Sequence, residues 1–138
     1  MVCHANSTPP SSSPTNSIST NQNAAALYDQ GFAASNNNDY KGALSLFMEA
    51  LKDDPNNPDI LNMVAHTQRK LGDINDALAN YQKALELRPN FPVAREYLGE
   101  AYIQAATGEI ATLKSYGDNG KEQADDLIKS LKDAAAKS

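Results

Sequence analysis

Cysteine, tryptophan and basic charge are scarce in this 138-residue sequence. A single cysteine allows no internal disulfide, so stability has to come from packed apolar surface. Lys and Arg together number 12 against 17 Asp and Glu, which gives a net charge of −5. This balance argues against nucleic-acid partners and against an anionic membrane surface, because both are bound mainly through Lys and Arg. No run approaches the roughly 20 apolar residues that a membrane-spanning helix needs.

Motifs that carry chemistry are also missing from the sequence. There is no phosphate-binding glycine loop, no dinucleotide-binding glycine run and no nucleophile elbow. The two histidines, His4 and His66, stand far apart, and the Cys3-His4 pair has no further ligand nearby. The acid pairs 53–54 and 125–126 fit a solvated helix surface better than a catalytic pocket. We therefore expect no enzymatic activity, no metal site and no cofactor.

The first 23 residues differ in composition from the rest of the chain. They are rich in Ser, Pro and Asn and contain no Lys, Arg, Asp or Glu. Such a segment cannot bury enough apolar surface to offset the entropy of ordering, so residues 1–23 are predicted to be a disordered tether. With no visible leader the default location is the cytoplasm. The tether also resembles the spacer after a removed leader, so a periplasm-like compartment is the alternative.

From residue 24 onward the sequence repeats itself. Four matched positions recur at one offset, because 77 − 43 and 89 − 55 both equal 34. The matched residues are Ala43, Phe47, Ala50 and Pro55 in the first copy and Ala77, Tyr81, Ala84 and Pro89 in the second. Turn formers and prolines divide each copy into two helices, expected at 24–36 with 40–53 and at 58–71 with 74–87. A third first helix is expected at 92–105.

This pattern resembles the tetratricopeptide repeat, whose first helix carries a large residue, Leu-Gly and an aromatic. The clearest match is Arg95-x2-Leu98-Gly99-x2-Tyr102. The resemblance implies an all-α, right-handed solenoid of antiparallel helix pairs, with about 2.5 repeats and a C-terminal capping helix. The repeats are expected at 24–57 and 58–91. A degenerate third repeat at 92–117, where Ser115 stands in the aromatic place, leaves 118–138 as the cap.

The resemblance also implies a function, since first helices of such solenoids line a concave groove that binds protein segments. We expect a non-enzymatic adaptor or assembly factor with a protein or peptide partner of unknown identity. His66, Arg69 and Lys70 are expected to form a small basic band in the groove. The alternative is a structural domain that self-associates into a homodimer through its open end. The expected groove residues are Tyr28, Phe32, Asn62, His66, Arg69, Lys70, Glu96, Tyr97 and Glu100.

One subtype of the family can be excluded on residues. Chaperone-binding members hold a C-terminal carboxylate with a clamp of Lys, Asn and Arg. The matching places in this sequence hold Tyr28, Phe32, Met63, Val93 and Tyr97. The clamp is therefore absent, and no binding to chaperone tails is expected.

Overall fold

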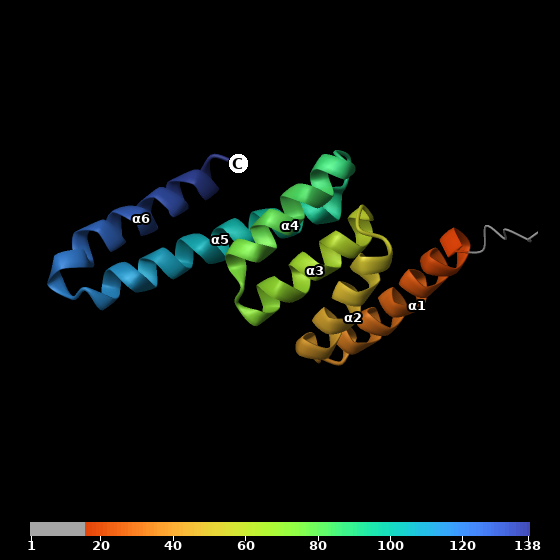
Figure 1. Ribbon diagram of the computed structural model, residues 1–138. Helices are drawn as coiled ribbons and strands as arrows, with labels where there is room; N and C mark the ends of the chain where they lie inside the picture. The colour runs from red at the N-terminus through yellow and green to blue at the C-terminus, as the bar shows by residue number, and fades with distance from the viewer. Residues whose placement is uncertain (1–15) are drawn as a thin grey trace, which may run out of the picture.

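The computed structural model describes residues 16–138, with side chains from residue 22 onward. This part of the chain forms six α-helices and no strand (Figure 1). None of the described helices is long and apolar enough to cross a membrane. The helices are α1 (Asn16–Asn36), α2 (Tyr40–Asp53), α3 (Pro58–Leu71), α4 (Ile74–Leu87), α5 (Pro92–Ser115) and α6 (Asp118–Ala136).

Each helix packs against the next one along the chain, which produces a row of antiparallel pairs (Figure 1). The first helices of successive pairs also touch, α1 against α3 and α3 against α5. This arrangement confirms the predicted all-α solenoid built on tetratricopeptide-like units.

Local chemistry sets the helix ends where the sequence predicts them. The Asp39 carboxylate accepts a hydrogen bond from the Gly42 backbone N–H at 3.0 Å and caps the start of α2. The Asn57 side chain does the same for α3, where Pro58 occupies the first turn. Gly72 ends α3 with a φ of 91°, a left-handed conformation that glycine adopts without steric cost. These short turns make neighbouring helices antiparallel.

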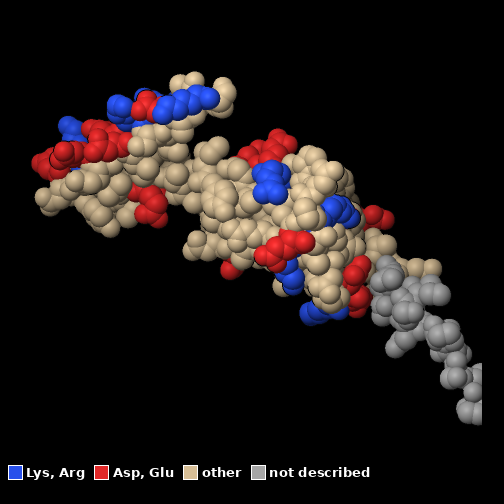
Figure 2. Space-filling model, turned by 90° about the horizontal axis from the view of Figure 1, so that it is seen from above, with Lys and Arg blue, Asp and Glu red and all other residues tan. Residues whose placement is uncertain are grey.

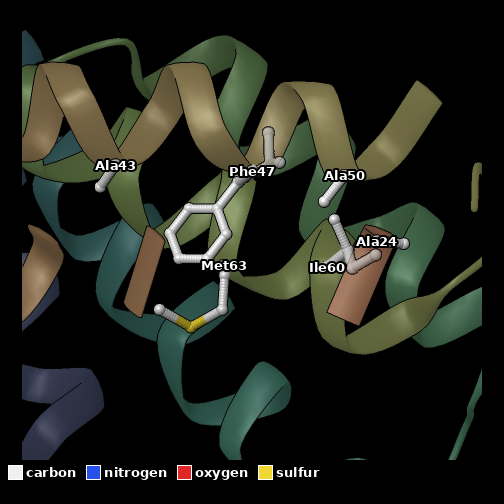
Figure 3. Close-up of a cluster of buried hydrophobic side chains, with 7 residues drawn as sticks. Ala24, Ala43, Phe47, Ala50, Ile60 and Met63 are labelled. Atoms are coloured by element: carbon white, nitrogen blue, oxygen red, sulfur yellow. The ribbon is translucent and has the colours of Figure 1, made fainter. Parts of the chain in front are cut away.

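The core lies between the helices and consists of small residues around single aromatic rings. Phe47 is fully buried among Ala43, Ala50, Ile60 and Met63 (Figure 3). Gly31 lies so close to this ring that an added Cβ would meet Phe47 Cε1 at 2.7 Å. Tyr81 takes the equivalent buried place in a second cluster, which is completed by Ala65, Ala77, Leu85, Ala94, Leu98 and Ala101. The alanine and aromatic positions that repeat at the 34-residue offset are thus buried, whereas Pro55 and Pro89 are exposed and an added Cβ at Gly99 would meet nothing within 4 Å.

The start of α1 differs from the expectation. The helix begins at Asn16, so residues 16–23 of the expected disordered tether are helical. No Pro or Gly follows Pro14 before Ala24, so nothing in this stretch stops the helix from extending backwards. Residues 1–15, with Cys3 and His4, lie outside the described residues.

The third repeat departs further from the expected pattern. A separate first helix at 92–105 and a short second helix were expected, but α5 is one helix from Pro92 to Ser115. The first two units break at an Asn-rich run and at Gly72-Asp73, whereas residues 106–115 contain neither Pro nor such a run. Gly108 alone costs only about 1 kcal/mol in a helix, which is too little to break it. The expected cap at 118–138 corresponds to α6, which packs on the far part of α5.

Candidate binding groove

The predicted groove residues occupy equivalent places on the first helix of each unit. Tyr28, Asn62 and Glu96 share one position at the 34-residue offset. Phe32, His66 and Glu100 share the next position, one helical turn further along. Because α1, α3 and α5 lie next to one another, these positions form two rows that run across the solenoid.

The α1 end of the groove is aromatic. The rings of Tyr28 and Phe32 are stacked with centroids 6.4 Å apart, and Tyr28 also contacts the Phe47 ring at 5.7 Å. Phe32 is 46% exposed, which is high for a phenylalanine. Burial raises the pKa of Tyr28, and the carboxylates of Asp59 and Asp29 raise it further. The pair is therefore a partly exposed aromatic patch beside two carboxylates.

A small cavity of about 250 Å³ opens beside Tyr28, where α1 meets the loop before α3. Its floor is apolar, and three carboxylates contribute to its lining, which comprises Ala24, Ala25, Tyr28, Asp29, Asp54, Asn57, Asp59 and Ile60. Asp59 is neutralised by Arg88, whose two terminal nitrogens lie 2.7 and 2.8 Å from its oxygens. Asp59 carries no local signal in the sequence, because its partner Arg88 lies 29 residues away.

The centre of the groove is more buried than expected. Asn62 is only 4% exposed, and its Oδ1 atom has no hydrogen-bond partner among the described residues. The His66 ring lies 4.7 Å from the Tyr97 ring, and its Nδ1 also lacks a partner there. Burial lowers the pKa of His66, and the charges of Arg69 and Lys70 lower it further. His66 is therefore neutral near pH 7.

Arg69 joins α3 to α5 instead of facing solvent. Its Nη2 atom lies 2.6 Å from Glu100 Oε2, and its side chain is only 12% exposed. Its guanidinium also lies 5.9 Å from the centre of the Tyr97 ring. The expected basic band is thus reduced, because His66 is neutral and Glu100 balances Arg69. Lys70 is the member of the expected basic band that stays charged and exposed.

Tyr81 completes this cluster from α4. Its ring lies 6.3 Å from that of Tyr97, and its buried hydroxyl has no hydrogen-bond partner among the described residues. Burial raises the pKa of Tyr81 to about 12, and the nearby Arg69 opposes the shift. A buried tyrosine hydroxyl that needs a partner was the signal that could have placed it here.

The structure therefore divides the nine predicted residues into four groups. Tyr28 and Phe32 form a stacked aromatic pair, and His66, Arg69, Tyr97 and Glu100 form a packed polar cluster. Asn62 is buried in the same row as Tyr28, while Lys70 and Glu96 are exposed. Within residues 16–138 no three His, Cys, Asp or Glu side chains gather as a metal site would require. Charged side chains are dense on α6 and sparser over the rest of the face in Figure 2.

Comparison with known proteins supports the repeat pattern. Models of the tetratricopeptide repeat match residues 24–57 and 46–79, and a model described as TPR repeat matches residues 65–105. Together they cover both complete units and the first part of α5.

Three similar proteins carry the name Photosystem I assembly protein Ycf3. That of one Prochlorococcus marinus strain is 35% identical over 107 residues, which are 75% of this chain and 58% of the relative. That of a second Prochlorococcus marinus strain (MIT 9211) is 38% identical over 82 residues, and that of Synechococcus sp. (strain CC9605) is 35% identical over 82. The last two matches cover 57% of this chain and 47% of each relative. The chain thus spans about half the length of the curated relatives it matches.

Proposed function

This chain belongs to the tetratricopeptide repeat family, and we propose that it is a non-enzymatic assembly factor whose groove holds a segment of a partner protein. Protein interaction is the coarse role that the repeats and the relatives support. The finer proposal is that α1, α3 and α5 together grip an extended segment, with the aromatic pair on α1 as its main anchor.

The observation that carries this proposal is the exposure of Phe32 beside Tyr28. Burying a phenylalanine side chain contributes about 1.5–3 kcal/mol. Because Phe32 is 46% exposed, a partner that covers its ring would gain a large part of this free energy. The Arg69–Glu100 pair and the His66–Tyr97 contact brace the neighbouring helices, so the surface beside the anchor is rigid. Rigid surfaces with one aromatic anchor lose little entropy on binding. A segment with an apolar side chain over Phe32 fits this surface.

The relatives suggest which partner to test. They are named as photosystem I assembly proteins, so we propose that the bound segment belongs to a photosystem I subunit. The expected absence of a chaperone clamp agrees with this choice, because the clamp positions carry apolar and aromatic residues.

The test is capture of photosystem I subunits from detergent-solubilised photosynthetic membranes by the immobilised chain. Phe32→Ala should lower the captured amount about tenfold or more, as expected of an aromatic anchor worth at least about 2 kcal/mol. Met48→Ala is the matched control, because Met48 is 42% exposed on α2 and lies outside the groove. Circular dichroism of both variants verifies the fold.

The outcomes separate the two parts of the proposal. Equal capture by the wild type, Phe32→Ala and Met48→Ala would refute the groove. If the wild type captures other proteins but no photosystem I subunits, and Phe32→Ala loses this capture, the proposed partner is wrong and the proposed groove stands. A concentration-dependent dimer in light scattering, with the groove buried, would favour the alternative of a self-associating domain.

A further inference from the structure

The third unit leaves one face of α5 uncovered, and we propose that this face docks an amphipathic helix of a partner protein. The face consists of Gly99, Tyr102 and Ile103. The docked helix would take the place that α2 and α4 take against α1 and α3. The proposal does not depend on the groove, because Gly99 and Tyr97 are about 200° apart around α5 at about 100° per residue.

The repeat offset shows that this face is built to receive a helix. Gly31, Ala65 and Gly99 are equivalent positions, at which a small residue lets the second helix approach. At Gly31 the neighbouring helix is so close that an added Cβ would lie 2.7 Å from Phe47. Ala65 is fully buried. At Gly99 an added Cβ would meet nothing within 4 Å.

The face is open because α5 does not turn back where the first helices of the other units do. Residues 99, 103, 106, 110 and 113 lie on one stripe of α5. The far part of this stripe is covered by α6, since Ile110 is buried and Gly120 packs against the Leu113 carbonyl. The near part is largely bare, with Ile103 60% exposed. Tyr102 lies at its edge, 49% exposed, and its hydroxyl accepts a hydrogen bond from Gln82 Nε2 of α4 at 2.9 Å. The open face therefore continues an interface that already holds a helix.

A second apolar stripe runs along α6, the helix that covers the far part of α5. In Figure 2 the C-terminal part of α6 stands away from the body, which leaves a notch between them. The apolar stripe of α6, formed by Leu127, Ile128 and Leu131, is only half-buried. A helix in the notch would contact both stripes.

The covered faces of the first two units indicate the chemistry of the missing helix. They are filled by helices with alanine, an aromatic four residues on and alanine three residues after that: Ala43, Phe47 and Ala50, and Ala77, Tyr81 and Ala84. Charge adds one distinction. Leu27 and Leu61 are replaced in the third unit by Arg95, which is exposed and makes no ion pair with the described residues. The expected partner is a helix with a small-x3-aromatic stripe and an acidic residue near its C-terminal end.

A second copy of this chain does not fit that description. Its two helices with the required pattern are already packed, because Phe47 and Tyr81 are fully buried. Among the other described helices, α1, α3 and α5 are packed in the solenoid, and α6 contains no aromatic residue. The proposal therefore takes a helix of another protein as the occupant, and a dimer is an outcome that contradicts it.

A synthetic helix tests the face directly. The probe is a fluorescent peptide with the sequence of residues 74–87, which carries the Ala-x3-Tyr-x2-Ala stripe and Glu86 near its end. Fluorescence anisotropy with the full chain should show saturable binding. Gly99→Leu should weaken it tenfold or more, since the side chain fills open space in the free protein and blocks the docked helix. Ile103→Asp should have a similar effect.

The controls make each outcome decisive. Phe32→Ala should bind the peptide like the wild type, because Phe32 lies in the groove. A peptide with serine in place of its tyrosine should bind at least tenfold more weakly. Absence of saturable binding, or equal binding by wild type and Gly99→Leu, would overturn the proposal. So would a dimer in light scattering that Gly99→Leu converts to a monomer, because a second copy would then cover the face.

Discussion

Two glycines at the same place in the repeat should respond to the same substitution with opposite sign. Gly31→Ala in α1 and Gly99→Ala in α5 each add one methyl group to a helix interior. Both variants gain the helix propensity of alanine, which is about 1 kcal/mol over glycine. The difference between them then isolates what each methyl group meets.

The structure shows which atoms the added methyl group meets at each position. At Gly31 the new Cβ would lie 2.7 Å from Phe47 Cε1 and 2.8 Å from Cδ1. The ring cannot yield easily, because it is fully buried and packs against Tyr28. Overpacking of this kind costs about 1–3 kcal/mol. Gly31→Ala should therefore lower the free energy of unfolding by about 0–2 kcal/mol, whereas Gly99→Ala should raise it by about 1 kcal/mol.

Urea unfolding followed by far-ultraviolet circular dichroism measures both values. Gly108→Ala is the matched control, because it lies in the same helix as Gly99 and an added Cβ there also meets nothing within 4 Å. It should stabilise the chain as Gly99→Ala does. If Gly99→Ala proves as destabilising as Gly31→Ala while Gly108→Ala stabilises, the face of α5 is covered in solution and the reasoning fails.

Three further predictions concern polar groups. Asp59→Asn removes the charged partner of Arg88. Because both side chains are nearly half exposed, the free energy of unfolding should fall by less than about 1 kcal/mol, and by less still at high salt. Denaturant unfolding at two salt concentrations measures this difference. Tyr81→Phe removes a buried hydroxyl that has no hydrogen-bond partner among the described residues, so stability near pH 7 should change by less than about 1 kcal/mol. Because the pKa of Tyr81 is about 12 in the fold and near 10 when unfolded, the wild type should lose stability from pH 10 towards 12, and Tyr81→Phe should lose less in the same unfolding series. Burial lowers the pKa of His66, so just below pH 6.5 the unfolded chain binds a proton on this ring and the folded chain does not. The free energy of unfolding should therefore fall as the pH drops through this range, and it should fall less in His66→Gln. NMR titration of the His66 ring checks the lowered pKa.

The first two units could be predicted from the sequence because their boundaries rest on local signals. Asn57-Pro58 begins a helix and Gly72-Asp73 ends one, whatever the rest of the chain does. The 34-residue offset places Phe47 and Tyr81 at equivalent positions, and both are fully buried. The third unit could not be predicted as safely. Its break was inferred from the offset alone, and residues 106–115 contain no strong breaker to produce it.

Candidate groove positions could be selected from the sequence, but the contacts of their side chains could not. Periodicity indicates the side of a helix on which a residue lies; of the two aromatic residues that it selected on α1, Phe32 is 46% exposed and Tyr28 is half-buried against Phe47. It cannot indicate how close the next helix is. Arg69 faces the groove side and still becomes buried, because Glu100 of α5 reaches it at 2.6 Å. Pairings between helices depend on their spacing, which no local pattern encodes.

The length of α5 links the two proposed surfaces. One side of this helix carries Tyr97 and Glu100 against α3, and the other side carries Gly99 and Ile103 in the open. A second helix folding back after residue 105 would have closed the open side and ended the solenoid there. Continuing α5 to Ser115 instead moves the cap outward, so that α6 covers Ile110 and leaves Gly99 and Ile103 exposed. Because a rigid helix separates the open side from the groove, a partner could occupy either surface without displacing the other, and Phe32→Ala and Gly99→Leu should affect separate binding events.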